Sequence, residues 1–180
     1  MKFSIKERGS KEYYNEFLYV AFNYKMFLKN PHKKTHKLTN MLLYYGIMLL
    51  LFIGLFIYFY MDESNSFYLI CTGIFIFVFI LDVFIYISCI KRIKNYINDK
   101  GIKHVNIEKE YVEYKDDNKS FKVKFKDIKC VIMNKYSICF IPNSLNNAII
   151  SMTIEYKNDI INVLKKYKRE ELIINNWKEE

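Results

Sequence analysis

The chain has 180 residues, 52% of them hydrophobic and 26% charged, with a formal net charge of +9. Its mean hydropathy of -0.06 is typical of a soluble protein, but this value averages two opposite kinds of segment. Residues 39–61 contain no charge, and residues 66–90 contain only one, Asp82. About 20 apolar residues cross the core of a bilayer, so these two stretches exclude a purely soluble domain.

The leader before the first apolar stretch predicts two elements. Residues 2–7 alternate weakly, which indicates a short strand. Residues 10–29 predict a helix that begins at the N-cap Ser10 and ends before Pro31. Asn15 and Glu16 are expected to lie off its apolar face, and two positions for that face stay open: the membrane interface or the C-terminal domain. The residues of the face are Tyr13, Phe17, Val20, Tyr24 and Phe27.

The apolar stretches predict a helical hairpin, and they divide the chain. The second helix is expected to continue past the bilayer, to about residue 100, because its apolar spacing continues there. The expected parts are a leader (1–38), a first transmembrane helix (39–61), a loop (62–66), a second transmembrane helix (67–90) and a C-terminal domain (101–180).

Charges flanking the hairpin predict its orientation. The loop contains Asp62 and Glu63 and no basic residue, whereas lysine and arginine crowd the other ends of both helices. Basic residues favour the cytoplasmic side, so we expect both termini in the cytoplasm and the loop outside. The same basic residues are candidate contacts for anionic lipid headgroups; they are Lys33, Lys34, Lys37, Lys91, Arg92 and Lys94.

Asp82 is a candidate intramembrane polar site. Counting residues inward from the cytoplasmic side places it near the depth of Tyr45 and Gly46. An intramembrane carboxyl group suggests function, but the spans hold no basic partner, so the favoured role is structural, with Asp82 protonated or bonded to Tyr45 or to another subunit. Gly46, Leu50 and Gly54 share one helix face, which predicts close approach of the helices.

Residues 102–154 change to the two-residue period of strands, and residues 155–169 return to helical spacing. This order predicts an α+β membrane protein whose transmembrane hairpin is followed by an antiparallel β-barrel or roll closed by a C-terminal helix. Residues 170–180 are expected to extend that helix or to fray, and Trp177 to dock on the domain or membrane. A solvated face or an anionic-lipid surface both explain the alternating Lys122, Lys124 and Lys126.

No constellation of catalytic residues is recognisable, so the sequence predicts a non-enzyme without cofactor or metal. The four cysteines, at positions 71, 89, 130 and 139, lack metal-ligand spacing and are expected to be reduced thiols. The C-terminal domain carries only +3 of the net charge, from fifteen basic and twelve acidic residues. Nucleic acid is therefore not an expected partner.

The order of these parts resembles a known family. Residues 125–131 (FKDIKCV) resemble the aromatic-x-Asp-Ile-x-x-Val strand of YcxB-like bacterial membrane proteins, and residues 140–144 (FIPNS) resemble the Ile-Pro step that follows a strand there. The helix from Tyr156 resembles the closing helix of that family. The resemblance implies a pleckstrin-homology-like (PH-like) C-terminal domain, the bacterial cytoplasmic membrane as location, and no catalytic residue.

Three functions follow as expectations. The first is a small integral membrane protein that presents a cytoplasmic PH-like domain to a protein or an anionic-lipid partner. The second is a membrane-anchored immunity protein against a toxin or bacteriocin. The third is a component of an oligomeric transporter or channel, since two spans with one Asp82 are too few for a monomer. The oligomeric state is left open.

Overall fold

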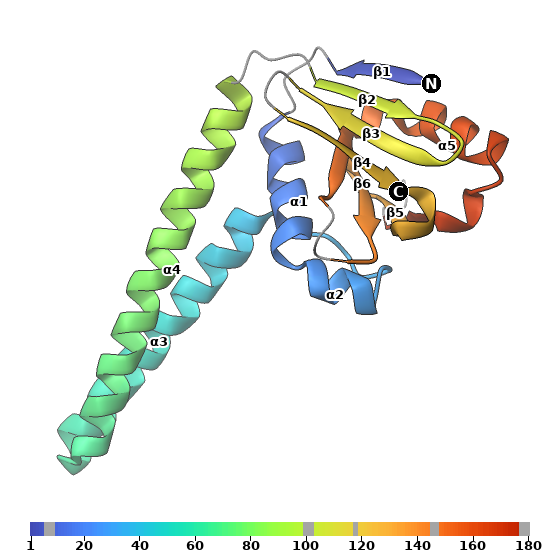
Figure 1. Cartoon of the computed structure of the whole chain (residues 1–180). Coiled ribbons are helices and arrows are strands. Elements are labelled where there is room, and N and C mark those ends of the chain that lie inside the picture. Colours follow the sequence, from blue (N-terminus) through green and yellow to red (C-terminus); the bar gives the residue numbers. More distant parts are fainter. Residues whose placement is uncertain (6–9, 99–102, 117–118, 145–147, 177–180) are drawn as a thin grey trace. The chain divides into compact units, whose positions relative to one another are not determined.

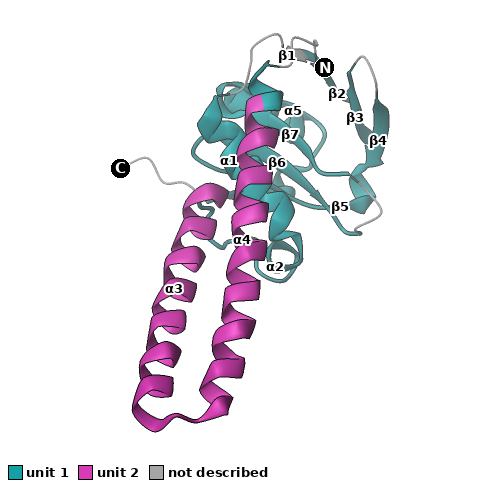
Figure 2. Cartoon of the chain, turned by 90° about the vertical axis from the view of Figure 1, so that its left-hand side faces the viewer, with its two compact units in different colours: residues 1–36, 95–180 teal, residues 37–94 magenta. Residues whose placement is uncertain are grey.

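The computed structural model describes residues 1–5, 10–98, 103–116, 119–144 and 148–176 (Figure 1). The chain forms two compact units (Figure 2). Unit 1 contains Met1–His36 together with Asn95–Glu180, and unit 2 contains Lys37–Lys94. The leader thus belongs to the same unit as the C-terminal strands, although the whole hairpin separates them in sequence.

The first sheet of unit 1 shows why the leader belongs there. Its order is β1-β2-β3-β4, and all neighbours are antiparallel. Phe3 on the first strand pairs with Val105, and the N-terminal amino group donates a hydrogen bond of 2.6 Å to the carbonyl of Ile107. The four strands are β1 (Lys2–Ile5), β2 (Lys103–Ile107), β3 (Tyr111–Lys115) and β4 (Ser120–Lys124).

The second sheet has the order β7-β6-β5-β8, and its last strand is parallel to β5. That strand corrects the expected extension of the C-terminal helix. Lys168 adopts a left-handed φ of 56°, which turns the chain out of helix α5, and residues 170–172 form a 3-10 turn before β8. Trp177 lies outside the described residues. The elements are β5 (Ile128–Met133), β6 (Ser137–Pro142), β7 (Ile150–Thr153), α5 (Lys157–Lys166) and β8 (Ile173–Asn175).

The core of unit 1 lies between the two sheets and α5. Alternate side chains of each strand point into it, as the two-residue period predicts. The fold is α+β, as expected, but the described strands form two separate sheets and do not close into a barrel. Fully buried members of the core include Val105, Ile107, Val112, Val131, Ile138, Met152, Ile160 and Leu164.

Every residue of β6 is buried, because helices cover the face of the second sheet that points away from the core. Those helices are α1 (Lys11–Phe22) and α2 (Tyr24–Lys29), separated at Asn23. The structure therefore shows the packing alternative for the aromatic face of the leader. Asn15 and Glu16 are buried too, contrary to expectation, because α1 is enclosed over more than the predicted stripe.

Unit 2 is an antiparallel pair of helices, α3 (Leu38–Glu63) and α4 (Ser66–Asn98, whose last residues belong to unit 1) (Figure 2). Both are long and apolar enough to cross a membrane. Residues 99–100, to which the second helix was expected to continue, lie outside the described part. Aromatic rings join the two helices: Phe56 and Phe75 stack with centroids 5.3 Å apart.

The less exposed side chains of the hairpin recur every three or four positions, the spacing at which two long helices keep one seam in contact. They include Gly46, Leu49, Ile53 and Phe56 on α3, and Phe75, Phe79, Asp82 and Tyr86 on α4.

The predicted glycine face is only partly correct. A Cβ at Gly46 would lie 3.2 Å from the Asp82 carboxyl, whereas a Cβ at Gly54 would meet no atom within 4 Å. Leu50 is exposed. The prediction assumed a four-residue step, but the contact between the helices repeats every 3.5 residues. Positions 50 and 54 therefore rotate away from α4, and of the three predicted residues Gly46 alone is in contact.

Candidate functional site

A groove of about 600 Å³ runs along the hairpin between α3 and α4. Aromatic and aliphatic side chains form most of its surface. Asp82 and Tyr45, the two residues of the candidate intramembrane site, both line it. The remaining lining residues are Tyr44, Met48, Leu49, Phe52, Phe75, Val78, Leu81 and Ile85.

Asp82 reaches the seam because the facing position on α3 is a glycine. Gly46 is buried, and the missing side chain leaves room for the carboxyl group beside the α3 backbone. Among the described residues no hydrogen bond joins Asp82 to Tyr45. Asp82 thus lies close to Gly46, as predicted. The hairpin holds this one carboxyl group in an otherwise apolar groove.

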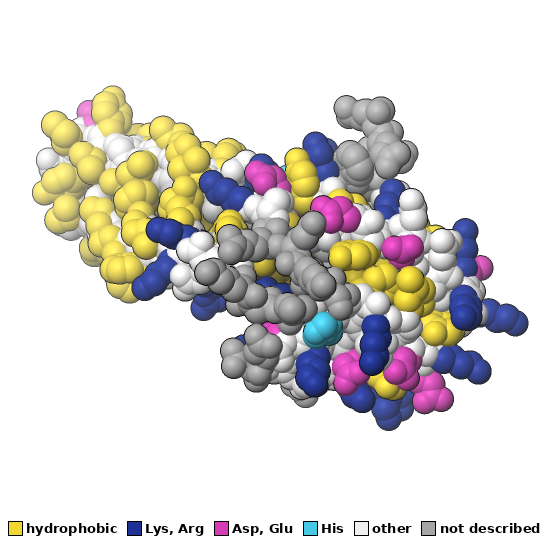
Figure 3. Space-filling view, turned by 90° about the horizontal axis from the view of Figure 1, so that it is seen from above, with side chains coloured by type: hydrophobic (Ala, Val, Ile, Leu, Met, Phe, Trp, Pro, Cys, Tyr) yellow, Lys and Arg dark blue, Asp and Glu magenta, His cyan; other side chains and the backbone are white. Residues whose placement is uncertain are grey.

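Charge is segregated along unit 2. Asp62 and Glu63 lie at the end of α3 beside the connecting loop. At the opposite end, Lys37 precedes α3, and the exposed Lys91, Arg92 and Lys94 occupy late turns of α4. In Figure 3, hydrophobic side chains cover most of the visible face of the hairpin, whereas charged side chains are spread over unit 1.

The candidate lysines of the first sheet are arranged differently from the expectation. Lys122 and Lys124 are exposed on β4, but Lys126 is not on the strand, because residues 125–127 turn into a 3-10 helix. The ammonium of Lys122 lies 3.3 Å from a Glu113 carboxylate oxygen and 4.7 Å from the centre of the Tyr111 ring. The hydrogen bond to Glu113 raises the pKa of Lys122. Because Glu113 offsets this charge, the face is less cationic than its lysines suggest.

A polar cluster that was not among the predicted sites lies buried between α1 and β6. Glu16 is only 5% exposed, and its Oε2 accepts hydrogen bonds of 2.9 Å from the backbone N–H of Tyr136 and from the Ser137 hydroxyl. The Asn134 amide donates in turn to Ser137 at 3.0 Å. Burial raises the pKa of the Glu16 carboxyl.

A signal for this cluster was present in the sequence. Tyr13, Glu16 and Val20 are spaced three and four residues apart, so they share one face of a helix. All three are buried, and the Tyr13 hydroxyl forms a hydrogen bond of 2.6 Å with Ser151 on β7. Glu16 therefore lies beside the predicted stripe, close enough to Tyr13 and Val20 to be buried with them.

The described residues hold no cluster of metal-ligating side chains. The thiols of Cys130 and Cys139 are buried, and desolvation raises the pKa of Cys130 to about 11 and that of Cys139 to about 12. Both are therefore protonated near neutral pH, which suppresses thiolate chemistry. Of the predicted site residues, the structure places Asp82 and Tyr45 in one groove. The predicted basic residues lie apart from it, at the end of the hairpin and on unit 1.

Fold and surface together define an α+β chain with two helices suited to a membrane and a separate unit built on two sheets. Comparison with protein-family models, with curated proteins and with solved structures finds no match.

Proposed function

We propose that the chain is a small integral membrane protein without enzymatic activity, anchored by α3 and α4, whose unit 1 is a cytoplasmic PH-like binding module. Its partner is a protein or an anionic lipid. The bacterial cytoplasmic membrane is its location under this proposal, as the resemblance to the YcxB-like family implies.

The exposed apolar surface of the hairpin carries the proposal. Leu51, Phe77 and Phe84 are each more than 60% exposed, and most of the other side chains of the two helices are exposed as well. Monomeric soluble proteins rarely expose contiguous apolar patches of more than a few hundred Å². Exposing such a patch to water costs free energy. In a bilayer this cost is absent, because hydrocarbon chains are as apolar as the side chains they contact.

The charges at the hairpin ends support the orientation. The four basic residues at one end of unit 2 favour the cytoplasmic side, and the acidic loop end favours the outside. Unit 1 then lies in the cytoplasm, because the chain enters it from the basic end of both helices.

The strand order of unit 1 supports a PH-like module. Four antiparallel strands are followed by a second meander and then by α5, which packs against the core between the sheets. The first of these strands is β1, so in this proposal the hairpin is an insertion after the first strand.

Labelling of cysteines in bacterial spheroplasts tests the anchor and its orientation. The native cysteines are replaced by serine or alanine, and Ser64→Cys at the loop is compared with Lys124→Cys on β4; both positions are exposed. A membrane-impermeant maleimide should label the loop variant in intact spheroplasts and the β4 variant only after permeabilisation. The reverse pattern, or recovery of the protein in the soluble fraction, would contradict the proposal.

A further inference from the structure

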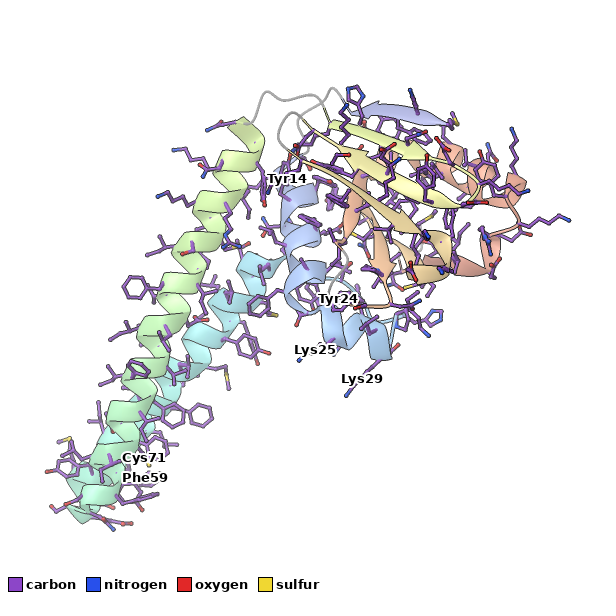
Figure 4. The ribbon with its side chains drawn as sticks, in the orientation of Figure 1. Tyr14, Tyr24, Lys25, Lys29, Phe59 and Cys71 are labelled. Atoms are coloured by element: carbon purple, nitrogen blue, oxygen red, sulfur yellow. The ribbon has the colours of Figure 1, made fainter. Side chains whose placement is uncertain are left out.

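One corner of unit 1 combines an exposed aromatic ring with lysines. Phe22, at the end of α1, is 57% exposed, although the other aromatic residues of α1 and α2 are buried or half-buried. Lys25 and Lys29 are exposed on α2 and extend away from the strands (Figure 4). We call Phe22, Lys25 and Lys29, together with the exposed Lys33 and Lys34 that follow them in the chain, the cationic corner.

The packing of α2 fixes which residues point outward. The Tyr24 hydroxyl donates a hydrogen bond of 2.5 Å to the carbonyl of Pro142, and Phe27 is completely buried. Lys25 and Lys29 are four residues apart on α2, so they share the opposite face of that helix. Phe22 is the last residue of α1, directly before the break at Asn23. The two lysines are exposed because Tyr24 and Phe27 hold the other face of α2 against unit 1.

The corner has one sign of charge. Residues 21–37 contain five lysines and no acidic residue. Among the described residues, no carboxylate pairs with Lys25 or Lys29. This differs from the first sheet, where Glu113 offsets Lys122. The corner therefore matches an anionic partner better than the β4 lysines do.

Hydrogen bonds hold the segment after α2 on unit 1. The side-chain amide of Asn176 donates hydrogen bonds of 2.9 Å to the carbonyls of Pro31 and Lys33. The ring centroids of His36 and Tyr19 are 5.6 Å apart. Only Lys37 then separates His36 from the first residue of α3.

Two residues of extended chain span at most about 7 Å. His36 on unit 1 is therefore within about 7 Å of Leu38, the first residue of α3. The lysine-rich residues 33–37 thus end where the apolar helix begins. If α3 crosses a membrane, that segment ends at the headgroups.

We propose that the cationic corner is a contact site for anionic phospholipid headgroups, in which the lysines pair with phosphate and Phe22 enters the interface. This inference rests on the proposed function, because it requires α3 and α4 to be in a membrane. Aromatic rings favour the headgroup region. Each lysine near an anionic surface strengthens the contact about fivefold, and salt weakens it.

Tryptophan fluorescence of the full chain in vesicles tests the site. The variant Phe22→Trp is made with Trp177→Phe, so that the introduced tryptophan is the sole one, and Ser120→Trp on exposed β4 is the matched control. The vesicles contain phosphatidylcholine with brominated chains, with or without phosphatidylglycerol. Quenching and a blue shift are expected for Phe22→Trp with phosphatidylglycerol, and neither for Ser120→Trp.

A second variant separates charge from apolar contact. Adding Lys25→Gln and Lys29→Gln should reduce the quenching severalfold, and high salt should do the same. Equal quenching with and without these lysines would overturn the proposal, as would an unquenched Phe22→Trp variant in vesicles that float with the protein. Failure of the protein to float with vesicles would instead contradict the proposed anchor, so the two failures are distinguishable.

Discussion

The Ser137 hydroxyl on β6 donates a hydrogen bond of 2.9 Å to the carboxylate of Glu16 on α1, across 121 residues of sequence. The backbone N–H of Tyr136 donates to the same oxygen. Since the hairpin lies between these residues in the chain, this contact fastens the leader to the strands that follow the hairpin. It is also where unit 1 holds a buried carboxyl group.

Stability should depend on pH through Glu16. Its folded-state pKa is raised by burial, so its contribution is fully present below the unfolded pKa, near 4.5, and is lost as pH rises through the folded value. Glu16→Gln keeps an acceptor for both bonds and does not titrate. The melting temperature of Glu16→Gln minus that of the original protein should therefore increase from pH 4.5 to 8, measured by circular dichroism in detergent.

Glu16→Ala serves as the contrasting variant. It leaves the Ser137 hydroxyl and the Tyr136 N–H without their acceptor, so it should destabilise unit 1 by about 1–3 kcal/mol. A difference between Glu16→Gln and the original protein that does not change with pH would show that Glu16 is not the titrating group.

Tyr24→Phe should destabilise unit 1. The substitution removes the donor to the buried Pro142 carbonyl and changes little else, at a cost of about 1–3 kcal/mol for an unsatisfied buried group. Tyr58→Phe on the exposed face of α3 is the control and should melt with the original protein. Equal melting temperatures for both variants would mean that the Tyr24 hydroxyl adds no stability.

Glycine substitutions should distinguish the two faces of α3. Gly46→Leu places side-chain atoms against the Asp82 carboxyl and Phe79, and overpacking of this kind costs about 1–3 kcal/mol. Gly54→Leu enters open space and should be neutral. Thermal denaturation in detergent measures both variants, and an equal loss of stability at the two positions would contradict the seam.

Asn176→Ala should loosen the segment before α3. The two carbonyls that its amide holds belong to Pro31 and Lys33, so trypsin should cut after Lys33 and Lys34 several times faster. Asn158→Ala on the exposed face of α5 is the control. Unchanged cleavage in Asn176→Ala would indicate that the segment is held by other contacts.

The strongly periodic elements were predictable. Ser10 caps α1 as expected, since its side chain accepts a hydrogen bond from the Tyr13 N–H. Helix α5 lies within the range predicted for the C-terminal helix, residues 155–169. By contrast, β8 is a three-residue strand whose partner is more than 35 positions earlier, so no local period marks it. The partial error at Gly46, Leu50 and Gly54 came from a four-residue step applied where the helices follow a 3.5-residue seam.

The sequence by itself determined that two apolar helices form a hairpin with oppositely charged ends, because length, hydropathy and charge are local properties. Only the tertiary structure decided that β1 completes the first sheet, that Glu16 is buried and that Phe22 remains outside. These outcomes depend on pairing between segments on either side of the hairpin. Pairing between distant strands depends on the packing of the whole core. The spacing of apolar residues along one segment therefore does not predict which distant segment it pairs with.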